Sequence, residues 1–185
     1  YYTELTVKSL KEAELFCCLL KTEFGLNGKI TKYKNKNAYR VYCSNGKNKR
    51  ITKNKLSEWL KKENINETGI NKKVPDFLFT QSNTIIAKFL SGLFHADGSF
   101  HKNGYYNSYI ITYHSISEKL IKDIQHLLLR LGIISFLRKQ SLKSSGFRTK
   151  NAVIWSLNIR GYDIIRFKNL IGFQTKKQET FLNLI

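Results

Sequence analysis

The sequence predicts an α+β fold made of two similar subdomains. The prediction depends on a series of strand and helix signals that occurs twice, and on a strongly apolar helix between the two copies. Hydrophobic residues make up 42% of the chain, with 12 Phe and 10 Tyr, which is enough for a packed core and excludes a disordered polycation. A length of 185 residues suits one domain or two small ones.

The first copy opens at residues 3–26. A short β-prone stretch, Leu5–Val7, precedes Ser9 and Glu12, whose Ser-x-x-Glu spacing predicts a capping box at the start of a helix. Apolar residues at helical spacing follow, and the helix is expected to end at Gly25, which suits a left-handed C-cap. The next expected elements are a basic strand, a second strand and a shorter helix, at 29–34, 38–43 and 53–62.

The second copy opens in the same way at residues 109–133. The β-prone stretch is Tyr109–Tyr113, the predicted capping box is Ser115 with Glu118, and the expected helix end is Gly132. The following strand, strand and helix are expected at 134–140, 152–158 and 163–170. Both copies then end in a Gly followed by a Lys pair, at 69–73 and 172–177. The sequence therefore contains one α/β unit twice.

The apolar stretch between the copies predicts a helix over residues 84–97. Small side chains, Ala87, Ser91, Gly92 and Ala96, are placed along it, and such residues let two helix backbones approach closely. The equivalent stretch of the first copy would precede Tyr1. We therefore expect a first subdomain at residues 1–76 that lacks this helix, and a second at 77–185 that has it.

The charge balance points to a polyanionic partner. The chain has 32 Lys and Arg against 13 Asp and Glu, a formal net charge of +19, and the basic residues run along its whole length. Lys and Arg that neutralise phosphates release the counterions condensed on nucleic acid, which favours binding. Nucleic acid is therefore the expected partner.

Other classes of protein are excluded by composition. No apolar run approaches the roughly 20 residues that cross a bilayer, and the polar start YYTELTVKSL is no secretory signal. Cys17, Cys18 and Cys43 fit neither a zinc spacing nor a disulfide framework, so they are expected to be ordinary thiols. The expected location is a reducing interior, cytoplasmic or organellar, and not the secreted space.

The segment LSGLFHADG, residues 90–98, resembles the motif of the LAGLIDADG homing endonucleases, with His95 in place of the first Asp. Upstream, Lys72-Lys73-Val74-Pro75 resembles the Lys-x-Ile-Pro segment of intein-borne members, in particular those in replicative DNA helicases. Residues 115–133 resemble the helix that follows the motif. The resemblance implies the LAGLIDADG homing-endonuclease fold, with two pseudo-symmetric αββαββα-like subdomains and saddle-shaped antiparallel sheets.

The resemblance also implies metal-dependent cleavage of double-stranded DNA at specific sites. Asp97 matches the carboxylate that holds Mg²⁺ (or Mn²⁺) at the scissile phosphate, and its partner would come from the absent first motif. Lys72 matches a catalytic lysine, and Lys176 is its counterpart in the second copy. His95 is expected to be a structural residue of the helix. Because one carboxylate is absent, we expect the chain to bind DNA but to cut it poorly or not at all.

The predicted strands supply a surface for DNA. Alternation along a strand places every second side chain on one face, and Arg, Lys, Asn and Gln read base edges in the major groove. The residues expected to contact DNA are Lys29, Thr31, Tyr33, Arg40, Tyr42, His101, Asn103, Tyr105, Arg138, Gln140, Lys143, Arg148 and Lys150.

Two alternatives use the same fold: an RNA-binding intron maturase and a non-catalytic DNA-binding regulator. Neither needs Asp97. The chain shows neither the N-terminal splicing residues nor the C-terminal His-Asn ending of an intein. We therefore expect a monomeric endonuclease segment, inserted in a larger intein-containing precursor, that does not splice by itself.

Overall fold

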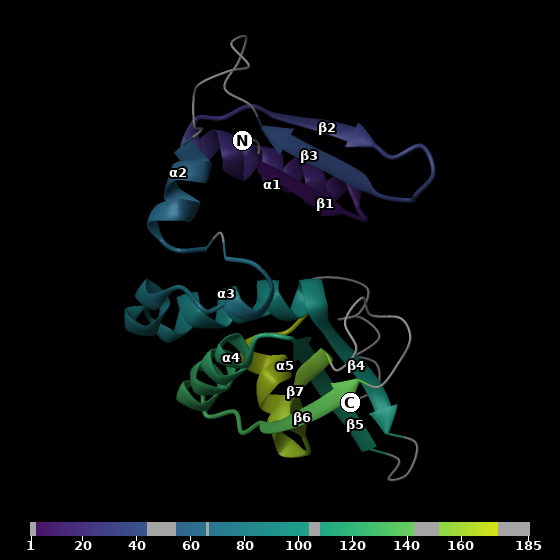
Figure 1. The fold of residues 1–185 in the computed structure, drawn as a ribbon, viewed down its shortest axis with the longest axis vertical. Helices are drawn as coiled ribbons and strands as arrows, with labels where there is room; N and C mark the ends of the chain where they lie inside the picture. Colours follow the sequence, from purple (N-terminus) through teal and green to yellow (C-terminus); the bar gives the residue numbers. More distant parts are fainter. Residues whose placement is uncertain (1–2, 44–54, 66, 104–107, 143–151, 174–185) are drawn as a thin grey trace. The chain divides into compact units, whose positions relative to one another are not determined.

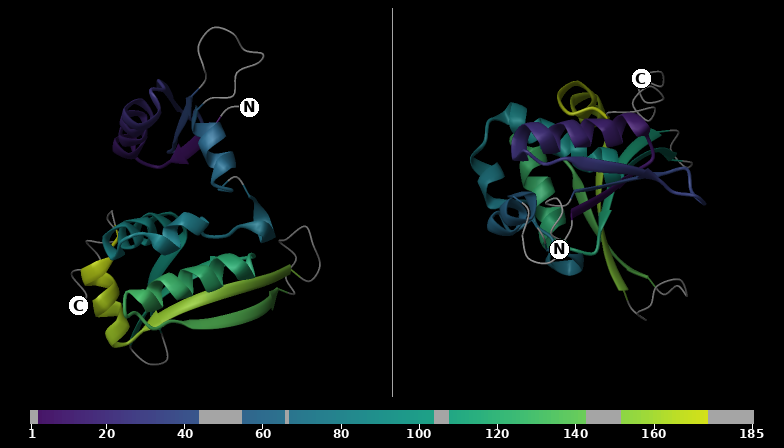
Figure 2. Two further views of the ribbon diagram at one scale, coloured as in Figure 1. Left: turned by 90° about the vertical axis from the view of Figure 1, so that its left-hand side faces the viewer. Right: turned by 90° about the horizontal axis from the view of Figure 1, so that it is seen from above.

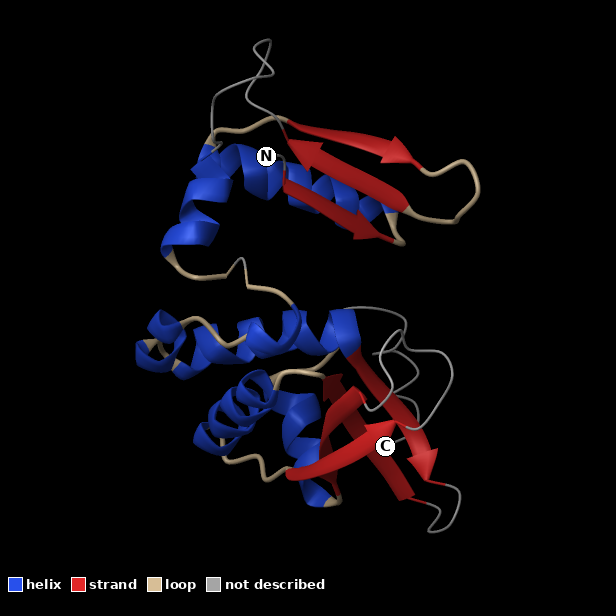
Figure 3. Ribbon diagram, in the orientation of Figure 1, coloured by secondary structure: helices blue, strands red, loops and turns tan. Residues whose placement is uncertain are grey.

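The computed structural model describes the chain except residues 1–2, 44–54, 66, 104–107, 143–151 and 174–185 (Figure 1). Contacts divide the chain into two compact units, Tyr1–Asn66 and Glu67–Ile185, and each has a hydrophobic core of its own. Helices and antiparallel sheets occur in both, as the sequence predicts (Figure 3). Among the described residues, no helix has the length and apolar character needed to cross a membrane.

The first unit is a three-stranded sheet covered by helices. Its elements are β1 (Thr3–Val7), α1 (Leu10–Phe24), β2 (Gly28–Lys32), β3 (Tyr39–Cys43) and α2 (Lys55–Lys62). The strands are antiparallel in the order β1-β3-β2, with Val41 of β3 opposite both Leu5 and Ile30. Val41 is buried against Ala13 and Leu20 of α1, so α1 covers one face of the sheet and the opposite face is polar.

The second unit is larger and carries a four-stranded antiparallel sheet. Its elements are the 3₁₀ turns η1 (Gly69–Asn71) and η2 (Asp76–Thr80), then α3 (Asn83–Asp97), β4 (Gly98–Asn103), β5 (Ser108–Ser115), α4 (Glu118–Arg130), β6 (Phe136–Leu142), β7 (Ala152–Arg160) and α5 (Tyr162–Leu170). The strand order is β4-β5-β7-β6. Figure 2 shows α4 lying along one face of this sheet, and the core forms there.

The internal repeat is confirmed by topology. The series strand, helix, strand, strand, helix is β1-α1-β2-β3-α2 in the first unit and β5-α4-β6-β7-α5 in the second. The sheet order β1-β3-β2 corresponds to β5-β7-β6. Within the described residues, the second unit has α3 and β4 in addition to the repeated elements. The predicted helix at 84–97 is α3, one residue longer at its start.

The expected capping boxes are wrong in detail. Ser9 precedes α1, as predicted, but its side chain makes no capping hydrogen bond. In the second unit β5 continues through Ser115, and the cap of α4 is Ser117, whose Oγ accepts from the backbone N–H of Leu120. The chain is still extended at Ser115, so its hydroxyl cannot reach the first turn. Gly25 and Gly132 do have left-handed backbone angles, with φ of 65° and 74°.

The segment before α3 packs with the second unit. The sequence places residues 67–76 in the first subdomain, whereas the contacts group them with residues up to Ile185. Val74 is fully buried in the second core, and its N–H donates to Asp123 of α4 at 3.2 Å. These contacts join residues far apart in sequence. Because of them, the boundary between the two compact units lies after Asn66, whereas the sequence places it after residue 76.

Candidate nucleic-acid interface and metal-binding carboxylate

Helix α3 buries one face in the second core. Ile86, Leu90 and Phe94 are fully buried, and the Phe94 ring lies 4.8 Å from Phe167 and 5.3 Å from Tyr113, centroid to centroid. Ser91, expected to face a twin helix, instead points inward and donates to the Gly172 carbonyl at 3.4 Å. The sequence pattern groups all four small residues together and does not separate the two helix faces.

The side of α3 away from this core carries small and apolar residues. Gly92 and Ala96 are exposed, and Ile85 is 45% exposed. A Cβ added at Gly92 would meet no atom within 4 Å. These residues lie on one side of the helix because they are seven and four residues apart, close to whole turns.

Asp97 lies where α3 passes directly into β4. It is the last helical residue, its side chain is exposed, and Gly98 begins the strand. The turn is tight, because a Cβ at Gly98 would come within 2.4 Å of the Phe94 carbonyl oxygen and 2.8 Å of its Cα. Gly98 therefore allows the close backbone approach that fixes the position of Asp97.

The carboxylate of Asp97 acts on a neighbouring tyrosine. Tyr113 of β5 is paired with Gly98 and is buried. Burial raises the pKa of Tyr113 to about 12, and the negative charge of Asp97 adds to the increase. Asp97 also stands at the negative end of the helix dipole, which disfavours a carboxylate there. A cation bound at Asp97 would offset the negative charge of the carboxylate in both cases.

One carboxylate makes only part of a metal site. No group of three or more His, Cys, Asp and Glu residues capable of holding an ion occurs in the described portion of the chain. Mg²⁺ is commonly held by one or two carboxylates, with waters and substrate phosphates completing its ligands. Asp97 fits the role of one such ligand in a site that also needs groups from elsewhere. His95, two residues before Asp97 on α3, is half-buried.

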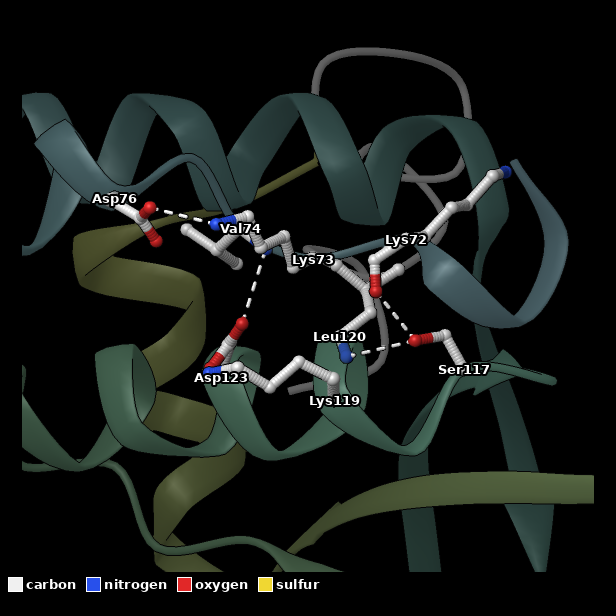
Figure 4. Close-up of polar contacts among 8 residues, drawn as sticks. All are labelled: Lys72, Lys73, Val74, Asp76, Ser117, Lys119, Leu120 and Asp123. Carbon is white, nitrogen blue, oxygen red and sulfur yellow. Dashed lines mark hydrogen bonds and ion pairs between the residues drawn. The ribbon is translucent and has the colours of Figure 1, made fainter. Parts of the chain in front are cut away.

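Lys72 has a fixed backbone and an exposed side chain. The hydroxyl of Ser117 donates to the Lys72 carbonyl at 2.5 Å and accepts from Leu120 N–H at 3.1 Å, while the N–H of Val74 donates to Asp123 (Figure 4). Figure 4 shows the Lys72 side chain directed away from these bonds. The predicted catalytic lysine is thus attached by its backbone to the N-terminus of α4.

Two ion pairs surround the same segment. Lys119 Nζ lies 2.5 Å from Asp123 Oδ1, and Lys73 Nζ lies 2.7 Å from Asp76 Oδ2 (Figure 4). Asp123 is buried, so its two oxygens are shared between an ammonium and a backbone N–H. Lys73 differs from Lys72, because its ammonium has a carboxylate partner three residues away.

The sheet of the second unit has a polar face opposite its helices. Register places His101 opposite Ile110, which pairs with Arg160, and places Arg138 opposite Ser156, which pairs with His114. The predicted residues His101, Arg138 and Gln140 therefore share this face, since all lie on the side away from Leu157 and Ile159. Asn103 ends β4 in register with Ser108.

Further polar side chains on this face were not predicted. They are His114, Asn158 and Arg160, of which His114 and Arg160 are exposed. Their alternation with buried residues in β5 and β7 was the available signal. The rung next to the motif also joins Ser99 to Thr112, whose hydroxyls lie 2.5 Å apart.

The first sheet has a matching outer face, which is the side of β1, β2 and β3 away from α1. Its residues are Glu4, Thr6, Lys29, Thr31, Arg40 and Tyr42. Lys29 lies opposite Tyr42, and Thr31 lies opposite Arg40, so the two predicted alternating sets are direct neighbours. Tyr33, just beyond β2, belongs to the same face because its hydroxyl reaches Glu4.

Glu4 is the acidic member of this face and was not predicted. Its Oε1 lies 2.7 Å from Nε of Arg40 and accepts from the Tyr33 hydroxyl at 3.5 Å. The hydrogen bond from Arg40 is the main reason that the pKa of Glu4 lies below its usual value. Arg40, one of the residues expected to contact DNA, is therefore ion-paired with an acidic side chain on the same face.

Five predicted residues lie outside the described residues. They are Tyr105, Lys143, Arg148, Lys150 and Lys176.

Comparison with known proteins agrees with this geometry. Residues 84–172, which run from the start of α3 past α5, match the family described as LAGLIDADG-like domain. This part of the chain is similar to that family. The matched segment includes Asp97 and the polar face of the second sheet.

The whole chain resembles homing endonucleases in fold. It aligns with the homing endonuclease I-DmoI in complex with DNA and manganese at a TM-score of 0.60 and 18% identity, covering 92% of this chain and 80% of that one. The alignment extends beyond residues 84–172, so the first unit takes part in it. The LAGLIDADG homing-endonuclease fold predicted from the sequence is therefore confirmed.

Similar sequences occur in proteins whose names describe different activities. Glutamine–fructose-6-phosphate aminotransferase of Methanocaldococcus jannaschii is 32% identical over 89% of this chain. Replicative DNA helicase DnaB of Rhodothermus marinus is 33% identical over 70% of it. The chain spans only 14% of the length of each.

Proposed function

We propose that this chain is the DNA-binding and DNA-cleaving segment of a LAGLIDADG homing endonuclease. The observation that carries the proposal is Asp97, exposed at the point where the motif helix enters β4. The polar face that begins at this point also holds His101, Arg138 and Arg160. A carboxylate at the margin of a cationic sheet face suits a bound metal beside a phosphate backbone.

The reaction is hydrolysis of a phosphodiester bond in double-stranded DNA. Bound Mg²⁺ or Mn²⁺ supplies an activated water and neutralises charge on the phosphate oxygens. Asp97 would hold that metal as one of its carboxylate ligands, since the described residues offer no complete ligand cluster. Lys72 and Lys176 would place a positive charge where negative charge develops. The hydrogen bond to its backbone supports this role for Lys72, because a functional side chain is positioned more accurately when its backbone is held in place.

DNA binding would use the two polar sheet faces. Lys29 and Arg138 represent the cationic residues of each face, within a chain of net charge +19. Most such contacts go to phosphates and fix the register of the protein on the duplex. A β-sheet face also fits the major groove, where base edges are distinct.

The setting proposed is an insertion in a larger host protein. An aminotransferase and a helicase have no reaction in common, and yet each contains a similar segment that is 14% of its length. A segment shared in this way is a mobile element rather than the source of either activity. We propose an intein-containing precursor in a cellular or organellar interior, within which the chain acts as a monomer with internal pseudo-twofold symmetry.

The test is a salt titration of duplex binding combined with a cleavage assay, with and without Mg²⁺, on a library of candidate insertion sites. We expect sequence-preferring binding that weakens by about 10³–10⁵-fold between 50 and 200 mM salt, as six to ten phosphate contacts require. We expect little cutting by the chain alone, because Asp97 belongs to no cluster of three or more potential metal ligands among the described residues. Asp97→Asn should keep the binding and abolish any remaining Mg²⁺-dependent nicking.

Other outcomes would select the alternatives. Preference for structured RNA over duplex DNA would replace the endonuclease by a maturase. Tight, specific duplex binding with a biological effect that Asp97→Asn leaves unchanged would replace it by a non-catalytic regulator.

A further inference from the structure

The outer face of the first sheet contains a three-residue cluster built around an acid. Glu4 on β1 is opposite Tyr42, and Arg40 on β3 is opposite Thr6, so Glu4 and Arg40 are diagonal neighbours on adjacent strands. Their side chains meet at 2.7 Å, between Oε1 and Nε. The Arg40 guanidinium carbon also lies 6.0 Å from the centre of the Tyr33 ring. The guanidinium therefore has a carboxylate at one edge and an aromatic ring nearby.

A carboxylate at this position opposes simple attraction to phosphate. In the described strands of the first sheet, Glu4 is the one acidic side chain on the outer face. It removes a full positive charge from a surface that needs cations to bind DNA backbone. Its side chain is 24% exposed and that of Arg40 is 40% exposed, so the pair stands at the surface, where an ion pair adds little to folding stability. Neither attraction to phosphate nor stability explains why the acid is there.

Orientation does explain it. A phosphate contact tolerates a mobile cation, whereas reading guanine requires a planar fork of donors held in one direction. The ion pair engages Nε, which is one of the five N–H donors of the guanidinium. The ring of Tyr33 adds a second restraint through cation–π attraction. A side chain restrained before binding loses less freedom when it meets its base.

We infer that Arg40 is a sequence-reading residue for a guanine in the major groove, and that Glu4 is the positioning residue that holds it. The inference rests on the proposed DNA binding and adds to it that different residues of the first sheet bind bases and phosphates. Lys29, exposed on the same face, contacts phosphate. Glu4 lowers the electrostatic attraction to any DNA, but it restricts tight binding to fewer DNA sequences.

The two effects of Glu4 have opposite signs, and that makes them separable. Selection from a randomised duplex library, followed by sequencing, gives the base preference at each position for the unaltered chain and its variants. Arg40→Lys keeps the charge and removes the fork. We expect it to lower the preference for guanine at one base pair by about fivefold to a hundredfold, the range for one bidentate contact. Binding to non-preferred DNA should change little.

Glu4→Gln keeps an oxygen acceptor and removes the charge. We expect tighter binding to random duplex DNA, together with a loss of about threefold to tenfold in the preference at the same base pair. Glu14→Gln is the matched control, since Glu14 is exposed on α1, the helix on the opposite side of the sheet. It should tighten non-specific binding without altering any base preference. Thermal unfolding of each variant checks that the fold is kept.

A double-mutant cycle completes the test. If Glu4 acts through Arg40, Glu4→Gln has no further effect on base preference in the Arg40→Lys background. Unchanged preference in either single variant, or the same loss in Glu14→Gln, overturns the assignment while leaving DNA binding intact. An unaltered chain without any duplex preference removes the proposed function itself, and the assignment with it.

Discussion

The two units share the repeated order strand, helix, strand, strand, helix but differ in how they bury the long helix of that repeat, α1 in the first unit and α4 in the second. In the second unit α4 buries residues such as Ile121, Ile124 and Leu127 fully, because the core formed with α3 and the segment before it surrounds the helix. In the first unit α1 is buried at Ala13 and Leu20, while Leu15 and Leu19 are 59% and 46% exposed. The added helix and strand of the second unit therefore build a core as well as place Asp97. The helix that carries Asp97 is therefore also a main element of the second core.

The largest effect should follow from removing the anchor of α3. Phe94→Ala should lower the free energy of unfolding of the second unit by about 3–5 kcal/mol, the usual cost of truncating a buried Phe. The chain has two tryptophans, Trp59 in α2 of the first unit and Trp155 in β7 of the second. Denaturant unfolding of Trp59→Phe and Trp155→Phe backgrounds follows each unit separately. A shared shift of both transitions would contradict independent cores.

The tight turn at Asp97 is the next test. Gly98→Ala places a Cβ against the Phe94 backbone and should cost about 1–3 kcal/mol through overpacking. Gly92→Ala is the matched control, because space is open there and a helical Ala is favoured over Gly by about 0.5–1 kcal/mol. Unfolding followed by Trp155 measures both. Equal stabilities for the two variants would mean that the turn relaxes freely.

The equivalent helices α1 and α4 should respond differently to loss of their capping serines. Ser117→Ala removes the acceptor for Leu120 and the donor to the Lys72 carbonyl, and should cost about 1–2 kcal/mol. Ser9→Ala should cost less than about 0.5 kcal/mol, since its side chain makes no capping bond. Unfolding followed by Trp155 and Trp59 separates the two. A similar loss at both sites would show that α1 is capped as α4 is.

The last effect concerns pH and develops only above pH 10. The pKa of Tyr113 is raised from 10.0 to about 12, first by burial and then by Asp97, so the folded state favours the neutral phenol. The resulting stabilisation is fully present below pH 10 and is lost as pH rises through 12. Comparing unfolding of the unaltered chain with Tyr113→Phe across this range measures it. Asp97→Asn should lower the Tyr113 pKa slightly; no change would place the carboxylate too far away to act.

Much of this fold follows from local patterns, and the exceptions have two causes. The apolar run at 84–97 identifies α3 because its periodicity is long and strong, and alternation in the strands correctly groups Lys29 with Thr31, and Arg40 with Tyr42. The cap of α4 was missed because Ser115 and Ser117 are both suitable residues, and only the end of β5 decides between them.

The other differences come from contacts between distant parts of the chain. Glu4 forms an ion pair with Arg40 on the adjacent strand, 36 residues later in the sequence. Ser117 donates to the carbonyl of Lys72, and a helix and two strands separate these two residues in the sequence. No spacing rule contains such pairs. For the same reason the sequence could propose Asp97 as a metal ligand but could not place Tyr113 beside it.

The edge strand β1 has a consequence for how the chain behaves in concentrated solution. Among the described strands β1 has one neighbour, β3, whereas its counterpart β5 is bonded on both sides, by β4 and β7. A strand with one bare side presents unpaired N–H and C=O groups, which can recruit a strand from another molecule. Among the described strands, the first unit therefore has a sheet edge at β1 where a further strand could pair.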